Sequence, residues 1–158
     1  MKHRILRADY GPTIDKIGDA PNCTMGLAME HFAWESIPLE VLSDMISRKI
    51  ISGEKAMIAQ IFLKKDAVVP EHHHESEQVT YVLEGALKFE LEGKEVVVQK
   101  GEVLRIPSYV PHRAVALEDT FDLDIFSPIR KDWLAKDDAY LRRGEREPTP
   151  LADARGSE

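Results

Sequence analysis

A glutamine and two closely spaced histidines are arranged as in a metal site. They lie in the segment 71–85, EHHHESEQVTYVLEG, as His72, His74 and Gln78. Side chains on a β-strand alternate between its two faces, so residues an even number apart point the same way. The same alternation makes His73 point away from the other two histidines. The segment therefore predicts two imidazoles on one face, with an amide oxygen close to them.

Another histidine, His112, ends the segment 101–112, GEVLRIPSYVPH. Three imidazoles with one oxygen donor make a partial coordination sphere for a first-row divalent metal. We therefore predict a metal site made of His72, His74, Gln78 and His112. Its donors suit nickel, zinc, iron or manganese, and the spacing does not choose among them. The alternative interpretation is a solvated, histidine-rich turn that binds no ligand.

The neutral glutamine indicates what such a metal would do. An ionised glutamate would cancel one unit of the metal's charge, whereas the amide oxygen of Gln78 cancels none. A divalent ion then keeps its full formal charge to polarise a bound oxygen, which favours Lewis-acid chemistry over redox cycling. Thr80 shares the face of Gln78 and is predicted to be a hydroxyl in the pocket wall. Alternatively, it is a threonine favoured on a strand for its branched side chain.

A second set of chemical groups lies in the segment 122–130, DLDIFSPIR. Asp124 and Phe126 share one face of the expected strand, and Arg130 follows shortly after it. A carboxyl group, an aromatic ring and a guanidinium together would suit a sugar acid as ligand. Arg130 would hold the carboxylate with two hydrogen bonds, Phe126 would cover the C–H surface, and Asp124 would transfer a proton. The alternative is an edge strand with solvated charges and a structural Asp–Arg pair.

Short strands must position these groups. Apolar residues alternate with polar ones over short runs, and glycines and prolines separate the runs every 8–12 residues, a pattern typical of an all-β sandwich or barrel. The expected strands cover residues 37–42, 46–52, 56–63, 78–85, 86–93, 94–101, 103–107, 112–117 and 121–128. Between the third and fourth of these, 64–74 is expected to be a turn, with Pro70 at a strand entry or edge.

Three regions are expected along the chain: an N-terminal arm at 1–36, a β-barrel at 37–130, and a C-terminal helix with a disordered tail at 131–158. The helix is predicted within 131–145, with Trp133 and Leu134 docked on the barrel. The arm is predicted to cover a sheet edge or pack on a second subunit. Its alternative is a frayed terminus.

Composition limits the partners and the location. The chain has 158 residues and a formal net charge of −7, which argues against nucleic acid because phosphate binding needs clustered Lys and Arg. No apolar run is long enough to span a bilayer, so we expect no membrane association. One cysteine, Cys23, excludes an internal disulfide and fits a reducing compartment. A cytoplasmic protein acting on a small molecule is the resulting expectation.

The spacing of the two histidine segments resembles the paired motifs of the cupin family. The first reads H-x-H, three residues, Gln, six residues, Gly85, and the second reads Gly101, five residues, Pro107, four residues, His112. Cupins usually carry glutamate at the position of Gln78. The resemblance implies a cupin or jelly-roll β-barrel with an N-terminal arm and a short C-terminal helix. Since cupins are often dimers, it also implies a homodimer.

The pattern D-x-F-x-P-x-R at 124–130 narrows the resemblance to the small cupins of pectin and alginate breakdown. Those proteins convert 4,5-unsaturated monouronates to the open-chain 4-deoxy-5-keto form. The resemblance implies that Asp124 and Arg130 are catalytic and that Phe126 contacts the substrate. This chain departs from them in having three residues, not four, between His74 and Gln78. Alternative functions are a cupin dioxygenase or lyase acting on another small acid, and a non-catalytic protein that binds a metal or a sugar acid.

Overall fold

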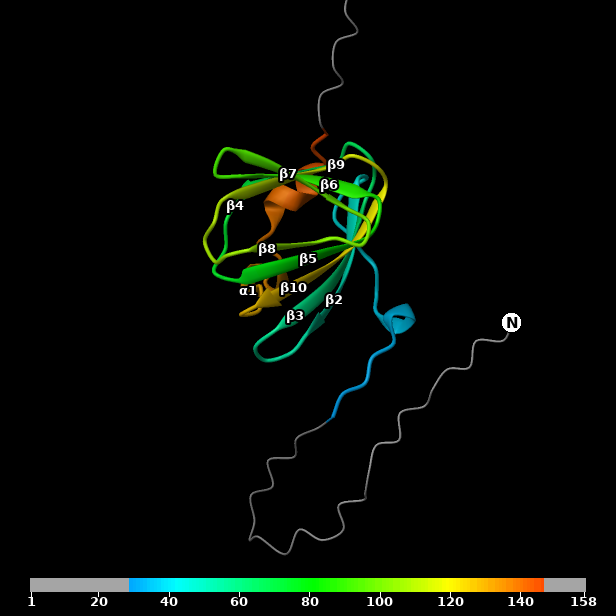
Figure 1. Cartoon of the computed structure of the whole chain (residues 1–158). Coiled ribbons are helices and arrows are strands. Elements are labelled where there is room, and N and C mark those ends of the chain that lie inside the picture. Colours follow the sequence, from blue (N-terminus) through cyan, green and yellow to red (C-terminus); the bar gives the residue numbers. More distant parts are fainter. Residues whose placement is uncertain (1–28, 147–158) are drawn as a thin grey trace, which may run out of the picture. The chain divides into compact units, whose positions relative to one another are not determined.

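Ten strands and three short helices form the part of the chain that the structure, a computed structural model, describes (Figure 1). This part is residues 29–146. The first 28 residues of the predicted arm and residues 147–158 of the predicted tail lie outside the described residues. The strands build two antiparallel sheets, so the expected all-β jelly-roll barrel is confirmed. The division into arm, barrel and tail stays a prediction.

The larger sheet has six strands in the order β1-β2-β3-β10-β5-β8. Their bounds are β1 (Glu40–Val41), β2 (Ile46–Ser52), β3 (Met57–Leu63), β10 (Thr120–Ser127), β5 (Glu77–Glu84) and β8 (Val103–Ile106). The late strand β10 pairs with β3 on one side and β5 on the other. The segment carrying Asp124 therefore lies at the centre of this sheet, where its inward side chains face the barrel interior.

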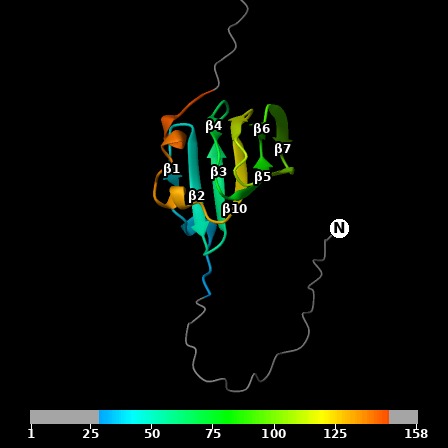
Figure 2. The ribbon, with the colours of Figure 1, turned by 90° about the vertical axis from the view of Figure 1, so that its left-hand side faces the viewer.

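The smaller sheet has four strands in the order β4-β9-β6-β7. Their bounds are β4 (Val68–His72), β9 (His112–Ala116), β6 (Ala86–Leu91) and β7 (Lys94–Gln99). Figure 2 shows the ribbon turned by 90° from Figure 1. The chain crosses from the larger sheet to the smaller one between β5 and β6 at Gly85, whose φ is +82°. A Cβ there would lie 2.5 Å from the carbonyl oxygen of Asp119, so no larger residue fits without a shift of the backbone.

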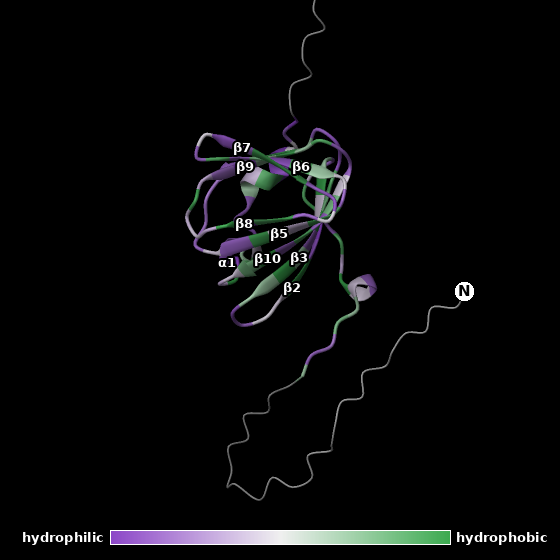
Figure 3. Cartoon of the chain, viewed as in Figure 1, coloured by the Kyte–Doolittle hydropathy of each residue, from purple (hydrophilic) through white to green (hydrophobic). Residues whose placement is uncertain are grey.

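The hydrophobic core lies between the sheets, and the alternation of side chains along each strand explains why. Figure 3 colours each residue of the ribbon by its hydropathy. Along β3 every second residue is buried, beginning with Met57. The same alternation on β10 buries Thr120, Asp122, Asp124 and Phe126. Three of these four inward residues are polar. Polar side chains facing a core need partners or a function, so this face of β10 marks the functional side of the barrel.

Most expected strands are present, with two local differences. The predicted strand 37–42 is reduced to the two residues of β1, and residues 34–36 before it form the 3-10 helix η1 (Trp34–Ser36). The stretch 64–74, expected to be a turn, contains β4. Pro70 lies within β4 at the edge of the smaller sheet, where a missing N–H costs no ladder hydrogen bond.

The C-terminal segment folds back onto the barrel as two short helices, α1 (Lys131–Leu134) and η2 (Ala139–Arg143). Trp133 is buried, as predicted, but Leu134 is 52% exposed, so the prediction that it docks on the barrel is wrong. The helix α1 has four residues, about one turn, so only one of its faces contacts the barrel, and Trp133 occupies that face. Within residues 29–146, no helix is long and apolar enough to cross a membrane.

Candidate functional site

The three predicted histidines converge at the end of the smaller sheet. His72 is the last residue of β4 and His112 the first of β9, and the two are paired across the strands. His74 lies in the loop that follows β4, so the prediction that it shares a strand with His72 is wrong. The three candidate ligand atoms nevertheless lie within 4.8 Å of one another, and His73 is exposed. The loop turns His74 back toward the strand ends and leaves His73 outside.

Backbone carbonyls fix the orientation of each ring. Nδ1 of His72 donates to the carbonyl of Pro70 at 2.9 Å. Nδ1 of His74 donates to that of Ser76, and Nδ1 of His112 to that of Val110, each at 2.8 Å. These partners assign the proton to Nδ1 and leave the lone pair on Nε2. Metal-binding histidines are held in the same way, by a hydrogen bond from the nitrogen that does not bind the metal.

The charge state of the three rings also fits a metal. Burial lowers the pKa of His72 to about 3 and that of His74 to about 4, and it lowers the pKa of His112 as well. The rings are therefore neutral near pH 7, as ligands must be. Nε2 of His112 is buried and has no hydrogen-bond partner among the described residues. The histidine triad could hold a metal ion, and such an ion would satisfy this nitrogen.

Gln78 reaches the same place from the opposite sheet. It lies on β5, and its Oε1 is 3.1 Å from Nε2 of His74. Its amide nitrogen donates to Thr80 Oγ1 at 2.9 Å and to Asp124 Oδ1 at 3.2 Å. These two acceptors hold the amide oxygen toward the histidines. They also give a physical reason for glutamine here, because a glutamate would bring its own carboxylate against that of Asp124.

Asp124 is buried, and its environment changes its acidity. Burial raises the pKa of Asp124 to about 6, while hydrogen bonds from Thr80 and Gln78 and the charge of Arg130 act in the opposite direction. The Thr80 hydroxyl and the Gln78 amide both donate to Oδ1. A carboxyl group with a pKa near 6 can accept and return a proton near neutral pH. Thr80 thus faces the pocket, as predicted, and orients this carboxyl group.

Arg130 lies beside Asp124 but is largely engaged by the protein. Its Nε donates to Asp132 Oδ1 at 3.0 Å and its Nη2 to Asp132 Oδ2 at 2.6 Å. Nη2 also donates to the Tyr140 hydroxyl at 2.9 Å. Nη1 is buried with no partner among the described residues. The expected two-pronged contact from Arg130 to a carboxylate is therefore not available, and one nitrogen remains.

Most of these groups line one cavity between the sheets, whose empty volume of about 550 Å³ includes open solvent. His74 is not part of its lining. Phe126, 1% exposed, forms part of the wall, with its ring centroid 5.7 Å from that of His74 and 4.9 Å from that of Trp133. The cavity therefore combines apolar walls with a few convergent polar groups, which is the usual composition of a small-molecule site.

Three further cavity residues, Arg48, Trp133 and Tyr140, were not expected there from the sequence. The Tyr140 ring stacks on His72 with centroids 4.7 Å apart. Arg48 is fully buried, with its guanidinium 4.4 Å from the centre of the Trp133 ring. The only sequence signal for Arg48 was an arginine at an inward-facing position of an alternating strand. The segment 135–146 has no regular apolar pattern, so nothing in the sequence indicated that Tyr140 would line the cavity.

Comparison with known proteins agrees with this architecture. The sequence profile of the cupin domain matches residues 60–127. A curated relative, described below, is 31% identical over 107 residues that make up 97% of its length. The chain belongs to the cupin family, as its motifs indicated.

That relative is the pectin degradation protein KdgF of Dickeya dadantii (strain 3937), and the alignment covers 66% of this chain. The solved structure of KdgF from Halomonas sp. is 33% identical, with a TM-score of 0.62, covering 66% of this chain and 99% of that one. An RmlC-like cupin from Shewanella frigidimarina is 30% identical, also with a TM-score of 0.62, covering 66% of this chain and 96% of that one. About a third of this chain thus lies outside each match.

Proposed function

We propose that this cupin opens and tautomerises 4,5-unsaturated monouronates with the help of a bound divalent metal. The observation that carries the proposal is that a buried carboxyl group, Asp124, shares one cavity with His72 and His112 of the histidine triad and with Arg130, which has one free nitrogen. The similarity to a pectin degradation protein supports a substrate derived from pectin. That this substrate is an unsaturated monouronate is what the resemblance of the 124–130 pattern implies.

The metal would be held by the Nε2 atoms of His72, His74 and His112, with the amide oxygen of Gln78 as fourth ligand. When bound, a nickel, zinc, iron or manganese ion with these neutral ligands supplies Lewis-acid polarisation of substrate oxygens. Gln78 has a second task, since its amide nitrogen fixes the position of Asp124 through a hydrogen bond of 3.2 Å.

Arg130 would bind the substrate's carboxylate through Nη1. Its other donors hold it in place by way of Asp132, so little side-chain entropy is lost when the substrate binds. The buried Phe126 ring would cover the C–H surface of the sugar. Arg130 lies with its guanidinium 5.3 Å from the centre of the Phe126 ring, so the two groups form adjoining parts of one binding surface.

Asp124 would move the proton in the tautomerisation. Opening of the hemiacetal breaks the bond between C1 and the ring oxygen: the C1 hydroxyl loses its proton as the aldehyde forms, and the ring oxygen gains a proton and becomes an enol hydroxyl at C5. Asp124 accepts the proton of the enol hydroxyl as the C5 ketone forms, and returns a proton to C4. No oxidant or reductant is consumed, since the product is an isomer of the substrate. Thr80 donates to Oδ1 throughout and leaves the other carboxyl oxygen to carry the proton.

The proposal is tested by following the ultraviolet absorbance of an unsaturated monouronate. We expect the absorbance to fall in the presence of the metal-loaded protein at the same rate with and without oxygen. A fall that requires oxygen would indicate a dioxygenase instead. No fall at all, with the acid still bound, would indicate a non-catalytic binding protein.

The proposal also covers the setting in which the protein acts. We place it in the cytoplasm as a homodimer, with an arm at 1–36, a barrel at 37–130 and a helical tail at 131–158. Support for the dimer comes from the outer face of the larger sheet, which leaves Tyr81 37%, Ile125 40% and Val103 59% exposed. Light scattering of the purified protein tests the dimer, and a monomer mass would refute it.

A further inference from the structure

A carboxylate has two oxygens, and Arg130 offers only one free nitrogen to receive them. The bidentate contact that arginine usually makes with a carboxylate is already made inside the protein, from Nε and Nη2 to Asp132. Nη1 alone is buried and without a partner among the described residues. If Arg130 binds the substrate's acid group, a second donor is needed for the other oxygen.

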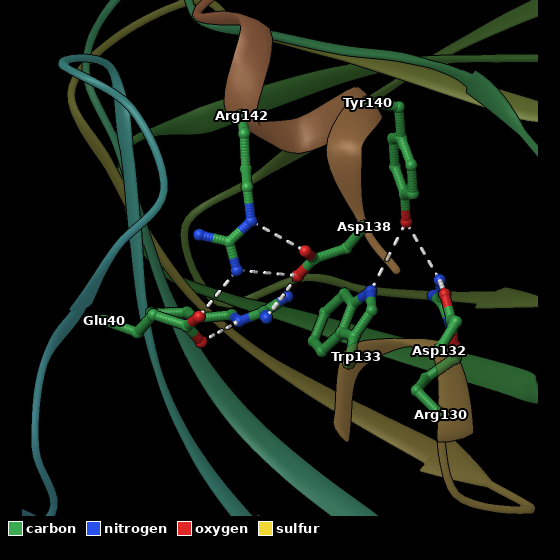
Figure 4. Close-up of polar contacts among 8 residues, drawn as sticks. Glu40, Arg130, Asp132, Trp133, Asp138, Tyr140 and Arg142 are labelled. Atoms are coloured by element: carbon green, nitrogen blue, oxygen red, sulfur yellow. Dashed lines mark hydrogen bonds and ion pairs between the residues drawn. The ribbon is translucent and has the colours of Figure 1, made fainter. Parts of the chain in front are cut away.

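The hydroxyl of Tyr140 has the required free hydrogen. Tyr140 Oη lies 2.9 Å from Nη2 of Arg130 and 3.3 Å from Nε1 of Trp133. Both nitrogens can only donate, so the tyrosine oxygen accepts both hydrogen bonds. Its own hydrogen then points elsewhere, and among the described residues Tyr140 donates to no acceptor. Because Tyr140 lines the cavity, this hydrogen is available to a ligand there. Figure 4 shows the two hydrogen bonds that the Tyr140 oxygen accepts, from Arg130 and Trp133.

We propose that the Tyr140 hydroxyl and Nη1 of Arg130 together bind the substrate's carboxylate, one oxygen each. This carboxylate clamp rests on the proposed role of Arg130 and assigns a function to a residue outside the cupin profile, which ends at 127. The shared hydrogen bond between Nη2 and the tyrosine oxygen fixes the spacing of the two donors. Arg130 acts on the ligand directly, and Tyr140 both supports Arg130 and contacts the ligand.

The segment that carries Tyr140 is held by a network of charges, shown in Figure 4. Asp138, fully buried, accepts hydrogen bonds from Arg48 and from Arg142. Glu40 accepts from the same two arginines, at 3.0 Å from Arg48 Nε and 2.7 Å from Arg142 Nη2. The helix η2 is thereby attached to β1 and β2.

The ring of Tyr140 is positioned by stacking on His72. The Tyr140 ring lies on His72, with its plane tilted by 30°. The ring and the hydroxyl of Tyr140 each have a partner that limits their movement. A hydroxyl held in this way loses little freedom when it binds a ligand, so its hydrogen bond contributes strongly to affinity.

Calorimetric binding of D-galacturonate to the metal-loaded protein tests the clamp, with D-galactose as the neutral counterpart that lacks the carboxylate. Tyr140→Phe removes only the hydroxyl. We expect it to weaken galacturonate binding about ten- to hundredfold, as for loss of a hydrogen bond to a charged group, and to leave galactose binding unchanged. Tyr81→Phe, the same change on the outer face of β5, should leave both affinities unchanged. Equal galacturonate affinity in Tyr140→Phe and wild type would overturn the clamp.

A double variant separates direct contact from mere support of Arg130. If Tyr140 acts only by positioning Arg130, Arg130→Ala/Tyr140→Phe should bind galacturonate as weakly as Arg130→Ala alone, and that result would also overturn the clamp. We expect the double variant to bind more weakly still. The reaction is tested separately on the wild type: galacturonate binding that depends on Tyr140, with no loss of unsaturated uronate, refutes the proposed function and keeps the clamp.

Discussion

Replacing Asp124 by asparagine isolates its capacity to carry a proton. Both protein donors, the Thr80 hydroxyl and the Gln78 amide, meet the same oxygen, Oδ1. Asparagine can keep an acceptor oxygen at that position and place its amide nitrogen where Oδ2 lies. The variant should therefore fold, bind metal and bind substrate as the wild type does. What it loses is the ability to accept and return a proton.

The expected loss follows from that one change. General acid–base catalysis by a positioned group contributes about 10²–10⁴-fold, or about 2.7–5.5 kcal/mol of barrier. We expect kcat of Asp124→Asn to fall by this amount while KM changes little, because substrate contacts are preserved.

Asp122 provides a matched control. It lies two residues earlier on β10 and faces the same way, but opposes Val82 and Ile61 where Asp124 opposes Thr80 and Ala59. Burial, and then the nearby charge of Asp124, raise the pKa of Asp122 well above its ordinary value. The neutral form of Asp122 is thus favoured, and asparagine resembles that form. We expect kcat of Asp122→Asn to stay close to the wild-type value.

The assay is steady-state loss of unsaturated monouronate absorbance, with metal content measured for each variant. Near-normal kcat in Asp124→Asn, at full metal content, would refute the reasoning and leave Asp124 as a structural partner of Gln78 and Thr80. An equal fall in both variants would show that any carboxyl loss on this face of β10 disturbs the site.

Three further predictions concern the metal and the buried acids. Purified protein should carry about one divalent metal per chain by elemental analysis; His74→Ala or His112→Ala should remove it, and the exposed His73→Ala should not. Gln78→Glu should keep or tighten metal binding and slow turnover, because it adds a negative charge; faster turnover would contradict the role of the neutral ligand. Because its pKa is raised, Asp122 in the native state binds up to one more proton than in the unfolded state between about pH 3.9 and its own raised pKa. In that interval Asp122 lowers stability as pH rises, by at most about 1.4 kcal/mol per pH unit. Urea unfolding at pH 5 and pH 8 should show Asp122→Asn gaining stability relative to wild type at the higher pH, and a gap independent of pH would count against this.

The alternation of apolar and polar residues along short segments made most of the strands of the barrel predictable. The strand at 46–52 is present with the expected bounds, and the inward face of β10 could be read from Asp124 and Phe126 at even spacing. The meeting of His72 with His112 followed from the cupin motifs, not from alternation. Alternation predicted that His74 lies on the side of His72 and that His73 points away, and both are confirmed, although the strand ends at His72 and His74 lies in the loop that follows it.

Contacts distant in sequence could not be predicted in this way. The partner of Arg130 is Asp132, two residues along the chain, but its second contact is Tyr140 in a short 3-10 helix with no apolar period. Asp138 is fully buried, and one of the two arginines that donate to it, Arg48, lies ninety positions earlier in the chain. Such pairs depend on the position at which the C-terminal segment packs against the barrel. The residue pattern of the segment does not specify this position.

The position of Trp133 gives the site a natural optical reporter. Its indole is close to two guanidinium groups, those of Arg48 at 4.4 Å and Arg130 at 4.7 Å from the ring centre. The chain has only one other tryptophan, Trp34, which lies outside the cavity lining. An anion that enters beside Arg130 changes the electric field across the Trp133 ring and so shifts its fluorescence. Occupancy of the site can therefore be followed in the unlabelled protein, even with ligands that do not react.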